Sequence, residues 1–587
     1  MLKLLKNLKK RDYILIIACV VFIAIQVWLD LKVPDYMSNI TMLVQTEGSA
    51  MPDILKEGAW MLLCTLGSLS MAILVGYCAS SVGASFGKII RKKVFSKVES
   101  LSMEDIKKFS TSSLITRTTN DISQVQMLIV MALQVLIKSP IMASWAISKI
   151  ANKGLDFAII PAIAVAIILV LVTFLIILVL PKFKIIQKLT DNLNRITREN
   201  LTGIRVVRAY NAEDYQSERF EKANDELTKT NMFTQKSMAI MYPVIGTIMA
   251  GINLSIYWLG AHLINQAQVI DRMNIFSNMV IFSSYAMQIL FSFMMLIMIF
   301  ILYPRASVSA KRINEVLDTN EKITSGKIKN NKNGLVGVIE FRDVSFKYPD
   351  AEEYILKNIS FTANKGETVA FIGSTGSGKS TLINLVPRFY DVTDGEILID
   401  GINVKDMDLE YLHNKIGYVS QKAIMFKGSV ESNVSFGDMF GKKPDIKKVK
   451  KAIEVAQGKD FVEKMENKYE SEIAQGGTNI SGGQKQRLSI ARAISREPEI
   501  YIFDDTFSAL DYKTDFLLRK NLKNHTENAT SLIVAQRIGT IKDADKIIVL
   551  DEGMCVGSGK HEELLKTCKV YQEIASSQLS LEEIERG

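Results

Sequence analysis

Hydrophobic residues dominate the first half of the chain in long stretches that contain few charges. A bilayer core of about 30 Å requires about 20 helical residues to cross it. Six stretches meet this length, at roughly Tyr13 to Val33, Gly58 to Ser85, Val125 to Lys149, Phe157 to Pro181, Ser237 to Ile270 and Met273 to Pro304. The first and third stretches contain charged residues. The pattern therefore defines the presence of these two spans more sharply than the positions of their ends. The pattern predicts six membrane-spanning helices.

Positive charges gather in two of the connecting loops. The loop after the second stretch contains Lys88, Arg91, Lys92, Lys93, Lys97, Lys107, Lys108 and Arg117. The loop after the fourth contains eleven Lys or Arg between Lys182 and Lys236, whereas the other loops carry very few. Because cytoplasmic loops carry an excess of Lys and Arg, we expect both termini and both long loops to lie in the cytoplasm. Their periodicity predicts helices that extend the spans beyond the membrane.

Polar residues follow one face of the sixth stretch. Ser277, Ser284, Gln288 and Ser292 recur at helical spacing among methionines and phenylalanines. Such a stripe can line a cavity for varied amphipathic ligands, so Ser284, Gln288 and Ser292 are candidate substrate-path residues. The same side chains could instead form hydrogen bonds between helices, and the sequence leaves both interpretations open.

A lysine within the third stretch is the second candidate feature of the membrane half. An intramembrane cation is costly and usually faces a water-filled path or a partner. Lys138 therefore joins the candidate substrate path. If it lies near the interface instead, its long side chain can extend the ammonium group to water.

After the polar stretch Thr319 to Gly334, the pattern changes to that of an α/β domain. Lys365 to Val386 reads as a strand, a glycine loop and a helix. The loop matches G-x-x-x-x-G-K-[ST] with Gly373, Ser374, Thr375, Gly376, Ser377, Gly378, Lys379 and Ser380, followed by Thr381. In this motif the glycines let backbone N–H groups converge on phosphates, the lysine reaches the β and γ phosphates, and the hydroxyl can bind Mg²⁺. The segment predicts a nucleotide site.

Two further segments of this half suit phosphate chemistry. An apolar strand ends in Asp504 and Asp505, which places Asp504 near the magnesium ion. Between the two motifs, Gly482 and Gly483 open an amphipathic helix. A helix N-terminus can bind an anion because its backbone N–H groups are unsatisfied.

Composition limits the class of protein. The chain is 48% apolar and 23% charged, too hydrophobic for an ordinary soluble protein and too rich in large apolar residues to be disordered. The net charge of +9 lies mainly beside the apolar stretches, as expected at a cytoplasmic membrane surface rather than for a nucleic-acid partner. The cysteines fit neither a zinc pattern nor a disulfide framework, so a reducing compartment suffices.

These motifs resemble those of the ATP-binding cassette family, over essentially the whole chain. The resemblance assigns adenine stacking to Tyr348, magnesium binding to Ser380, Gln421 and Asp504, and ATP and Mg²⁺ as cofactors. It identifies a signature motif that faces a partner's site, formed by Ile480, Ser481, Gly482, Gly483 and Gln484, and an interface loop formed by Ser508, Ala509, Leu510 and Asp511.

The fold class implied by the resemblance is an all-α six-helix transmembrane domain followed by an α/β P-loop ATP-binding cassette domain. We expect the transmembrane domain at residues 1–318, a linker at 319–337 and the cassette at 338–587. Ser112 to Asp121 and Gly203 to Asp214 resemble the family's coupling-helix regions. Because importers of this family generally keep the two parts on separate chains, the fusion favours export from the cytoplasm across the plasma membrane.

Two residues depart from the family pattern. Asp505 stands where the family usually has the glutamate that activates the attacking water, and Gln536 stands where it has a histidine that contacts the γ-phosphate. Aspartate is one methylene shorter, and a misplacement of about 1 Å can cost on the order of a hundredfold in rate. Glutamine can donate a hydrogen bond but cannot become cationic. The pair suggests a site that holds ATP and hydrolyses it slowly.

The signature motif, in contrast, departs only at Ile480, where leucine is usual. Since the family's ATP sites are shared across a dimer, a heterodimer would let this signature complete an active site on a second, homologous half-transporter. The chain therefore resembles the degenerate-site half of a heterodimeric bacterial multidrug exporter, with small amphipathic compounds and the lipid bilayer as its other partners. A dedicated lipid or peptide exporter and a nucleotide-gated membrane protein remain alternatives, whereas the spans exclude a soluble cassette protein.

Overall fold

The computed structural model describes residues 1–587 except 47, 152–154, 332–333, 350, 438–443 and 579–587. Contacts divide the chain into two compact units. The first comprises Met1–Glu99 and Thr111–Thr319, and the second comprises Ser100–Ser110 and Asn320–Gly587. Each unit is described by itself below.

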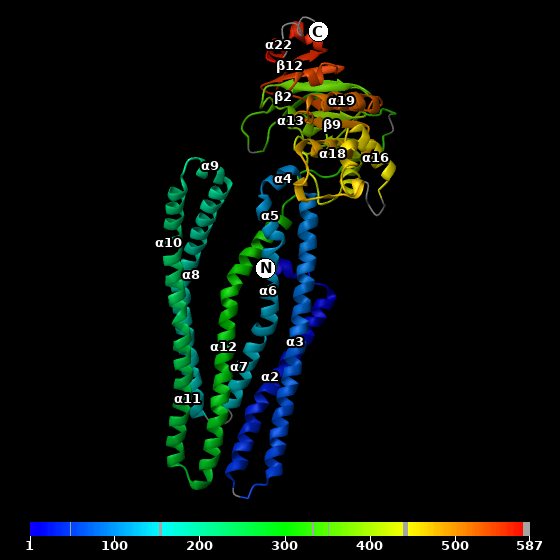
Figure 1. Ribbon diagram of the computed structural model, residues 1–587. Coiled ribbons are helices and arrows are strands. Elements are labelled where there is room, and N and C mark those ends of the chain that lie inside the picture. Colours follow the sequence, from blue (N-terminus) through cyan, green and yellow to red (C-terminus); the bar gives the residue numbers. More distant parts are fainter. Residues whose placement is uncertain (47, 152–154, 332–333, 350, 438–443, 579–587) are drawn as a thin grey trace. The chain divides into compact units, whose positions relative to one another are not determined.

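The first unit is built from helices, shown in blue, cyan and green in Figure 1. The described helices are α1 Leu2–Leu5, α2 Lys10–Gln45, α3 Met51–Ser100, α5 Thr111–Thr118, α6 Asn120–Met131, α7 Lys138–Ala151, α8 Leu155–Thr202, α9 Ile204–Ala209, α10 Glu213–Ala239, α11 Met241–Gln266 and α12 Val269–Leu317. Helix α12 packs against α2, α6, α7 and α11. Helices α8 and α10 run side by side, as both views show.

The six predicted spans are mainly helical, but the fifth, Ser237 to Ile270, also crosses the break at Ile240 and the connection of Ala267 and Gln268 between α11 and α12. Among the described residues, five helices are long and apolar enough to cross a membrane: Lys10–Gln45, Met51–Ser100, Thr111–Ile150, Glu213–Gln266 and Arg272–Leu296. In the region of the fourth predicted span, the described residues give the shorter apolar helix Ile159–Leu171, which lies within α8. The prediction of a helical transmembrane domain is confirmed.

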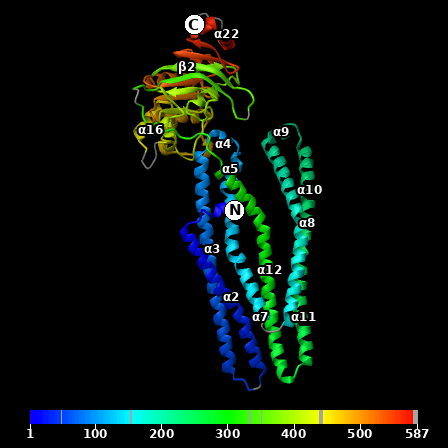
Figure 2. The same cartoon turned by 180° about the vertical axis from the view of Figure 1, so that it is seen from behind.

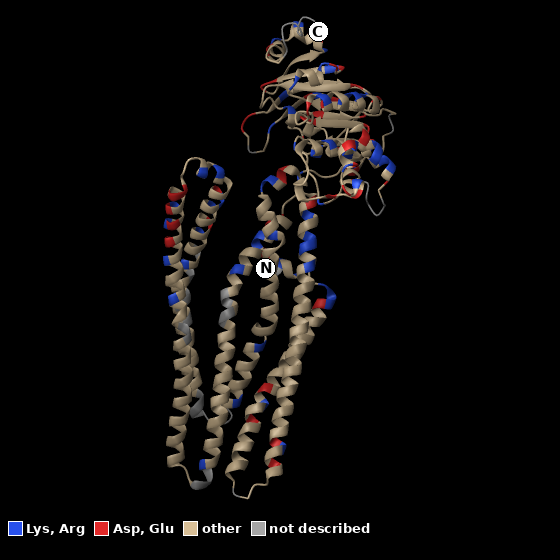
Figure 3. Cartoon of the chain, in the orientation of Figure 1, with Lys and Arg blue, Asp and Glu red and all other residues tan. Residues whose placement is uncertain are grey.

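The helices continue well beyond the length that a membrane requires. Helix α3 has 50 residues, which corresponds to about 75 Å at 1.5 Å per residue, against about 30 Å for the bilayer core. Figure 3 shows Lys and Arg gathered on the part of α3 that follows its apolar stretch. The two long basic loops are helical, as the sequence indicated, because their residues extend α3, α8 and α10.

One irregularity interrupts the third span. A π-helical turn, Ala132–Leu136, joins α6 to α7. Pro140 follows it within α7 and has no N–H group to donate to the carbonyl of Leu136, so one α-helical hydrogen bond is missing at this point. Ile137 separates the turn from Lys138, the cation predicted to lie within the membrane.

The second unit contains two sheets that meet in one apolar core. A four-stranded antiparallel sheet has the order β2-β1-β4-β5, formed by β1 Ile339–Phe346, β2 Leu356–Ala363, β4 Asp394–Ile399 and β5 Ile402–Asn403. A six-stranded sheet has the order β12-β11-β3-β10-β9-β6, formed by β3 Thr368–Gly373, β6 Ile416–Val419, β9 Ile500–Asp504, β10 Thr530–Val534, β11 Lys546–Asp551 and β12 Met554–Gly559. All neighbours in the larger sheet are parallel except β12.

Helices cover the larger sheet, whose strands are rich in Ile, Val and Phe because both faces are buried. The described helices of this unit are α4 Met103–Lys107, α13 Lys379–Leu385, α14 Leu409–Asn414, α15 Val430–Val434, α16 Ile446–Val455, α17 Lys459–Val462, α18 Gly482–Ser495, α19 Tyr512–His525, α20 Ile538–Ile541, α21 His561–Thr567 and α22 Lys569–Ser576. A short two-stranded sheet, β7 Gly428–Ser429 with β8 Glu472–Ile473, completes the unit. The α/β domain predicted from the second half of the sequence is confirmed.

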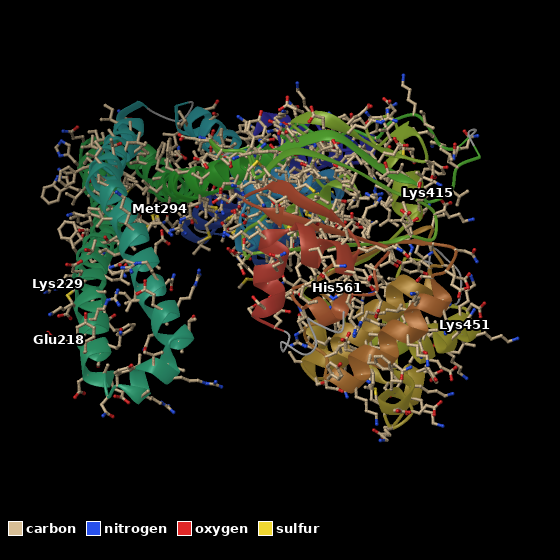
Figure 4. The ribbon with its side chains drawn as sticks, turned by 90° about the horizontal axis from the view of Figure 1, so that it is seen from above. Glu218, Lys229, Met294, Lys415, Lys451 and His561 are labelled. Atoms are coloured by element: carbon tan, nitrogen blue, oxygen red, sulfur yellow. The ribbon has the colours of Figure 1, made fainter. Side chains whose placement is uncertain are left out.

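A buried ion-pair cluster joins the end of α14 to the sheets. The Lys415 ammonium donates to Asp400 Oδ2 at 2.9 Å and to Glu499 Oε2 at 2.5 Å, and Lys415 is labelled in Figure 4. Asp400 is fully buried. Burial opposes the charge of Lys415, but hydrogen bonds to Glu499 and Asp400 outweigh it and raise the pKa of this ammonium above its usual range.

Substitution of Lys415 with methionine should therefore destabilise the cassette. The variant keeps the apolar stem but leaves the Asp400 carboxylate buried without its cation, which we expect to cost about 3–5 kcal/mol. Denaturant unfolding of the solubilised protein measures this. The matched control is Lys459→Met, which removes the exposed pair of Lys459 with Glu454 and should cost at most about 1 kcal/mol. Equal losses in both variants would contradict the prediction.

Candidate functional site

The candidate nucleotide site lies at the carboxyl ends of four neighbouring parallel strands. Strand β3 leads into the glycine loop, β9 ends at Asp504, β10 is followed by Gln536, and β6 is followed by Gln421. Ligands of open α/β sheets bind at this edge, because the loops that leave the strands converge there. The fold therefore collects residues that lie up to about 160 positions apart in the sequence.

The glycine loop has the backbone conformation that only glycine adopts easily. Gly376 and Gly378 have φ angles of 90° and 94°, in the region that L side chains rarely occupy. A Cβ atom on Gly373 would lie 2.0 Å from the carbonyl oxygen of Leu550. The motif glycines are thus required by the close approach of neighbouring backbone as well as by the turn itself.

Lys379 is folded back onto the loop that it follows. Its ammonium donates to the carbonyl oxygens of Gly373 at 2.8 Å and Ser374 at 2.7 Å, and to Ser377 Oγ at 3.2 Å. Burial lowers the pKa of this ammonium, opposed by the nearby carboxylates of Asp505 and Asp504. A phosphate would supply the negative charge that this buried cation lacks.

Two oxygen ligands suited to magnesium are already in contact. Ser380 Oγ donates to Asp504 Oδ1 at 2.8 Å, and burial raises the pKa of Asp504. Mg²⁺ prefers such hydroxyl and carboxylate oxygens and completes its shell with phosphates and water. The described part of the chain holds no group of three or more His, Cys, Asp or Glu side chains that could bind a metal. Ser380 and Asp504 would suit a Mg²⁺ ion bound together with a nucleotide, and that ion would neutralise phosphate charge.

The two residues that depart from the family pattern are hydrogen-bonded to each other. Gln536 Nε2 donates to Asp505 Oδ2 at 2.7 Å, and Gln421 Nε2 donates to the same oxygen at 3.2 Å. Asp505 is buried and has a positive φ of 44°. One of its two carboxylate oxygens is therefore already the acceptor of two amide groups.

Tyr348 lies beside the glycine loop, next to other aromatic rings. Its hydroxyl is 3.2 Å from Thr381 Oγ1. Its ring meets Phe346 and Tyr390 edge-to-face, with centroids 5.0 Å and 5.3 Å apart. The ring is thus fixed at the margin of the phosphate site, a position consistent with stacking on a base.

The signature motif opens helix α18 on an exposed surface. Ser481 caps the helix, since its side chain accepts from the Gln484 N–H while Gln484 Oε1 accepts from the Ser481 N–H. Ser481 and Gly482 are exposed, whereas Ile480 packs against the core. The first turn of α18 therefore begins at an exposed surface, where a second chain could approach.

The interface loop links the carboxylate of the site to helix α19. Ser508 Oγ donates to the Asp505 carbonyl at 2.9 Å. Ala509 is exposed and Leu510 is buried, and Asp511 caps α19 by accepting from the Thr514 N–H at 2.9 Å. A shift of this loop would therefore act on the backbone of Asp505, to which Ser508 is hydrogen-bonded.

The substrate-path candidates of α12 lie against helix α2. Ser292 is buried and donates to the Gln288 carbonyl at 2.9 Å, within its own helix. The amide of Gln288 is 3.5 Å from the Asp30 carbonyl, and Gln288 Oε1 is buried without a hydrogen-bond partner among the described residues. Ser284 is half-buried.

Lys138 is paired rather than free. Its ammonium lies 3.2 Å from Asp30 Oδ2, and Lys149 makes a second pair with Asp35 at 2.6 Å. Tyr285 on α12 donates to Asp35 Oδ1 at 2.8 Å. Asp30 is one of the charged residues of the first predicted span, and a carboxylate at this depth is a sequence signal for a partner of Lys138.

Known proteins share both halves of the chain. Residues 15–293 match the ABC transporter transmembrane region and residues 356–508 match the ABC transporter domain. An uncharacterized ABC transporter ATP-binding protein of Mycobacterium tuberculosis is 37% identical over 549 residues, covering 92% of this chain and 93% of the relative. The ATP-binding protein YfiB of Bacillus subtilis is 36% identical and covers 89% and 90%. The ATP-dependent lipid A-core flippase of Pseudoalteromonas translucida is 28% identical and covers 90% and 89%.

The fold agrees with these matches. The solved structure of a bacterial Atm1-family ABC exporter with ATP bound superposes with a TM-score of 0.81 at 21% identity, covering 97% of this chain and 99% of that one. With matching sequence across both halves and the same arrangement of helices and sheets, the chain belongs to the ABC transporter family, as a multi-pass membrane protein whose transmembrane and ATP-binding domains are fused in the exporter fold.

Proposed function

We propose that this transporter uses ATP to export amphipathic or hydrophobic compounds across the plasma membrane as one half of a heterodimer. In this proposal the chain's own ATP site hydrolyses slowly, and its signature motif completes the active site of the partner. Both termini and the ATP-binding domain lie in the cytoplasm, as the basic loops indicate.

The observation that carries the proposal is the contact between Asp505 and Gln536. A general base must accept a proton from the attacking water. Asp505 Oδ2 already accepts from the Gln536 and Gln421 amides, and its side chain is one methylene shorter than glutamate. The neutral Gln536 amide also contributes no charge toward a γ-phosphate. Both features reduce the rate of hydrolysis without weakening the phosphate contacts of the glycine loop.

The signature motif supports the partner's role. Its capping box is complete and its first residues are exposed, so a phosphate held by another chain could reach it. The cassette combines an intact signature motif with weakened hydrolytic residues. This combination favours a heterodimer, because a homodimer would repeat the weakened residues at both sites.

Purification with and without the product of the neighbouring gene tests the proposal. Alone, the chain should bind ATP with Mg²⁺ and hydrolyse it slowly, and the assembled pair should hydrolyse it rapidly. Turnover by the isolated chain at the rate of the pair would overturn the asymmetric assignment.

ATP-dependent uptake into inside-out vesicles separates a pump from a nucleotide-gated protein, which would show no accumulation against a gradient.

A lipid exporter is the second candidate for the transported compound. It is favoured by the similarity to a protein named as a lipid A-core flippase and by the paired charges of Asp30 with Lys138, which could receive a polar headgroup. Vesicles loaded with labelled lipid or with labelled amphipathic dyes distinguish the two substrate classes.

Replacement of Gln288 and Ser284 by leucine and alanine tests the substrate path. If these side chains line the path, the variant should change which compounds stimulate ATP hydrolysis, while basal hydrolysis and assembly persist. Gln288 Oε1 has no hydrogen-bond partner in the part of the chain that the structure describes, and a transported compound could supply one. The matched control is Ser292→Ala, because the Ser292 hydroxyl bonds to its own helix. A loss of expression or stability alone would favour a helix-packing role.

A further inference from the structure

A short segment between the membrane helices belongs to the cassette unit. Contacts assign Ser100–Ser110, which contains α4, to the second unit. The Lys322 N–H donates to Asp105 Oδ2 at 3.3 Å, and the Lys322 ammonium pairs with Glu104. These contacts hold α4 against the chain that enters the cassette.

The last residue of α4 reaches the aromatic rings of the nucleotide site. The Lys107 ammonium lies 4.6 Å from the centroid of the Tyr348 ring and 5.3 Å from that of Tyr390. Cations are attracted to ring faces at such distances. Hydrogen bonding to Tyr390 raises the pKa of Lys107, so the ammonium stays charged throughout the physiological range.

The ring of Tyr348 contacts two aromatic rings as well as the ammonium of Lys107. Phe346 and Tyr390, which belong to the buried core, meet it edge-to-face. Lys107 is an exposed residue, and its ammonium lies over the ring of Tyr348. A base that stacks on this face of Tyr348 must displace the ammonium.

We propose that Lys107 and the adenine base compete for Tyr348, so that nucleotide binding displaces the end of α4. The inference rests on the nucleotide site of the proposed function and adds to it a residue contributed by the segment between α3 and α5. Because linkage is reciprocal, whatever holds α4 in place weakens nucleotide binding, and bound nucleotide weakens the hold on α4. Since α3 ends at Ser100 and α5 begins at Thr111, the displaced segment is continuous with two helices of the membrane unit.

The test compares the affinity of the purified full chain and its Lys107→Met variant for ATP and for inorganic triphosphate. Methionine keeps a similar length but cannot make the cation–ring contact. We expect ATP affinity to rise about fivefold, the factor that corresponds to one partly exposed contact of this type. Triphosphate has no base and should not bind more tightly. The sign is diagnostic, because loss of a nearby positive charge would by simple electrostatics weaken the binding of both anions.

A neighbouring lysine provides the matched control. Lys347 lies over the ring of Tyr354 at 5.6 Å rather than over Tyr348, and Lys347→Met should not increase ATP affinity. In a Tyr348→Leu background, Lys107→Met should have a smaller effect than in the native chain. Unchanged or weaker ATP binding in Lys107→Met would overturn the competition, weaker binding indicating that Lys107 supports the base instead. Failure of the native chain to bind ATP would refute the nucleotide site itself, a result distinct from either.

Discussion

Placing aspartate at Gly483 should nearly abolish ATP hydrolysis by the assembled transporter. The added carboxylate would stand at the exposed first turn of α18, where the proposed heterodimer requires N–H groups to face the γ-phosphate of the partner's site. Loss of a single preorganised donor to a transition state costs about 100-fold or more, and a negative charge facing a phosphate adds repulsion. Steady-state hydrolysis by the purified pair measures the effect.

The fold of this chain tolerates the change. A Cβ atom at Gly483 would meet the Ala509 carbonyl oxygen at 3.6 Å and Leu510 Cδ2 at 3.7 Å, which are ordinary contact distances. Thermal unfolding of the variant should therefore match that of the native chain, and its own nucleotide binding should persist.

Lys379→Ala provides the contrasting variant. It removes the ammonium that reaches the phosphates of this chain's own site, so nucleotide binding there should weaken while the partner's site retains turnover. Equal loss of turnover from Gly483→Asp and Lys379→Ala would mean that the two sites contribute equally, against an asymmetric pair.

The elements of the site were predictable from sequence, but their mutual contacts were not. The glycine loop, Asp504 and the start of α18 each have a local pattern that identifies them. The bond between Asp505 and Gln536 depends instead on the register of two parallel strands, in which Val534 pairs with Asp504. Nothing in the local sequence sets that register. The sequence therefore showed Asp505 and Gln536 as two separate departures from a family pattern, whereas the structure shows that they are hydrogen-bonded to each other.

The membrane half shows the same division between local and long-range information. Long apolar stretches predicted the spans because bilayer thickness imposes a length on each helix separately. The partner of Lys138 and the assignment of α4 to the cassette unit depend on packing between elements that are distant in the sequence. Pro140 is a local sequence signal for an irregular helix near the π-helical turn. Whether a proline bends a helix depends on the side chains packed around it.

Restoring glutamate at 505 and histidine at 536 together should accelerate hydrolysis at this chain's own site, by about tenfold. Glutamate carries the carboxylate farther toward the attacking water, and histidine can offer a γ-phosphate contact that carries charge in its protonated form. Because the native side chains contact each other at 2.7 Å, either change alone disturbs the other residue. The double variant should therefore exceed the product of the single effects, a coupling expected of residues in contact.

The measurement is the retention of labelled nucleotide at this site in the assembled heterodimer, with the native pair as reference. Faster exchange in the double variant supports a site whose geometry limits the reaction. In the proposed heterodimer the partner's signature also faces this site. If that signature lacks its donors the gain will be smaller, because charge on the γ-phosphate in the transition state would remain unopposed. A native complex that already releases and hydrolyses nucleotide equally fast at both sites would show that Asp505 and Gln536 are a tolerated substitution, and the asymmetric mechanism would be wrong.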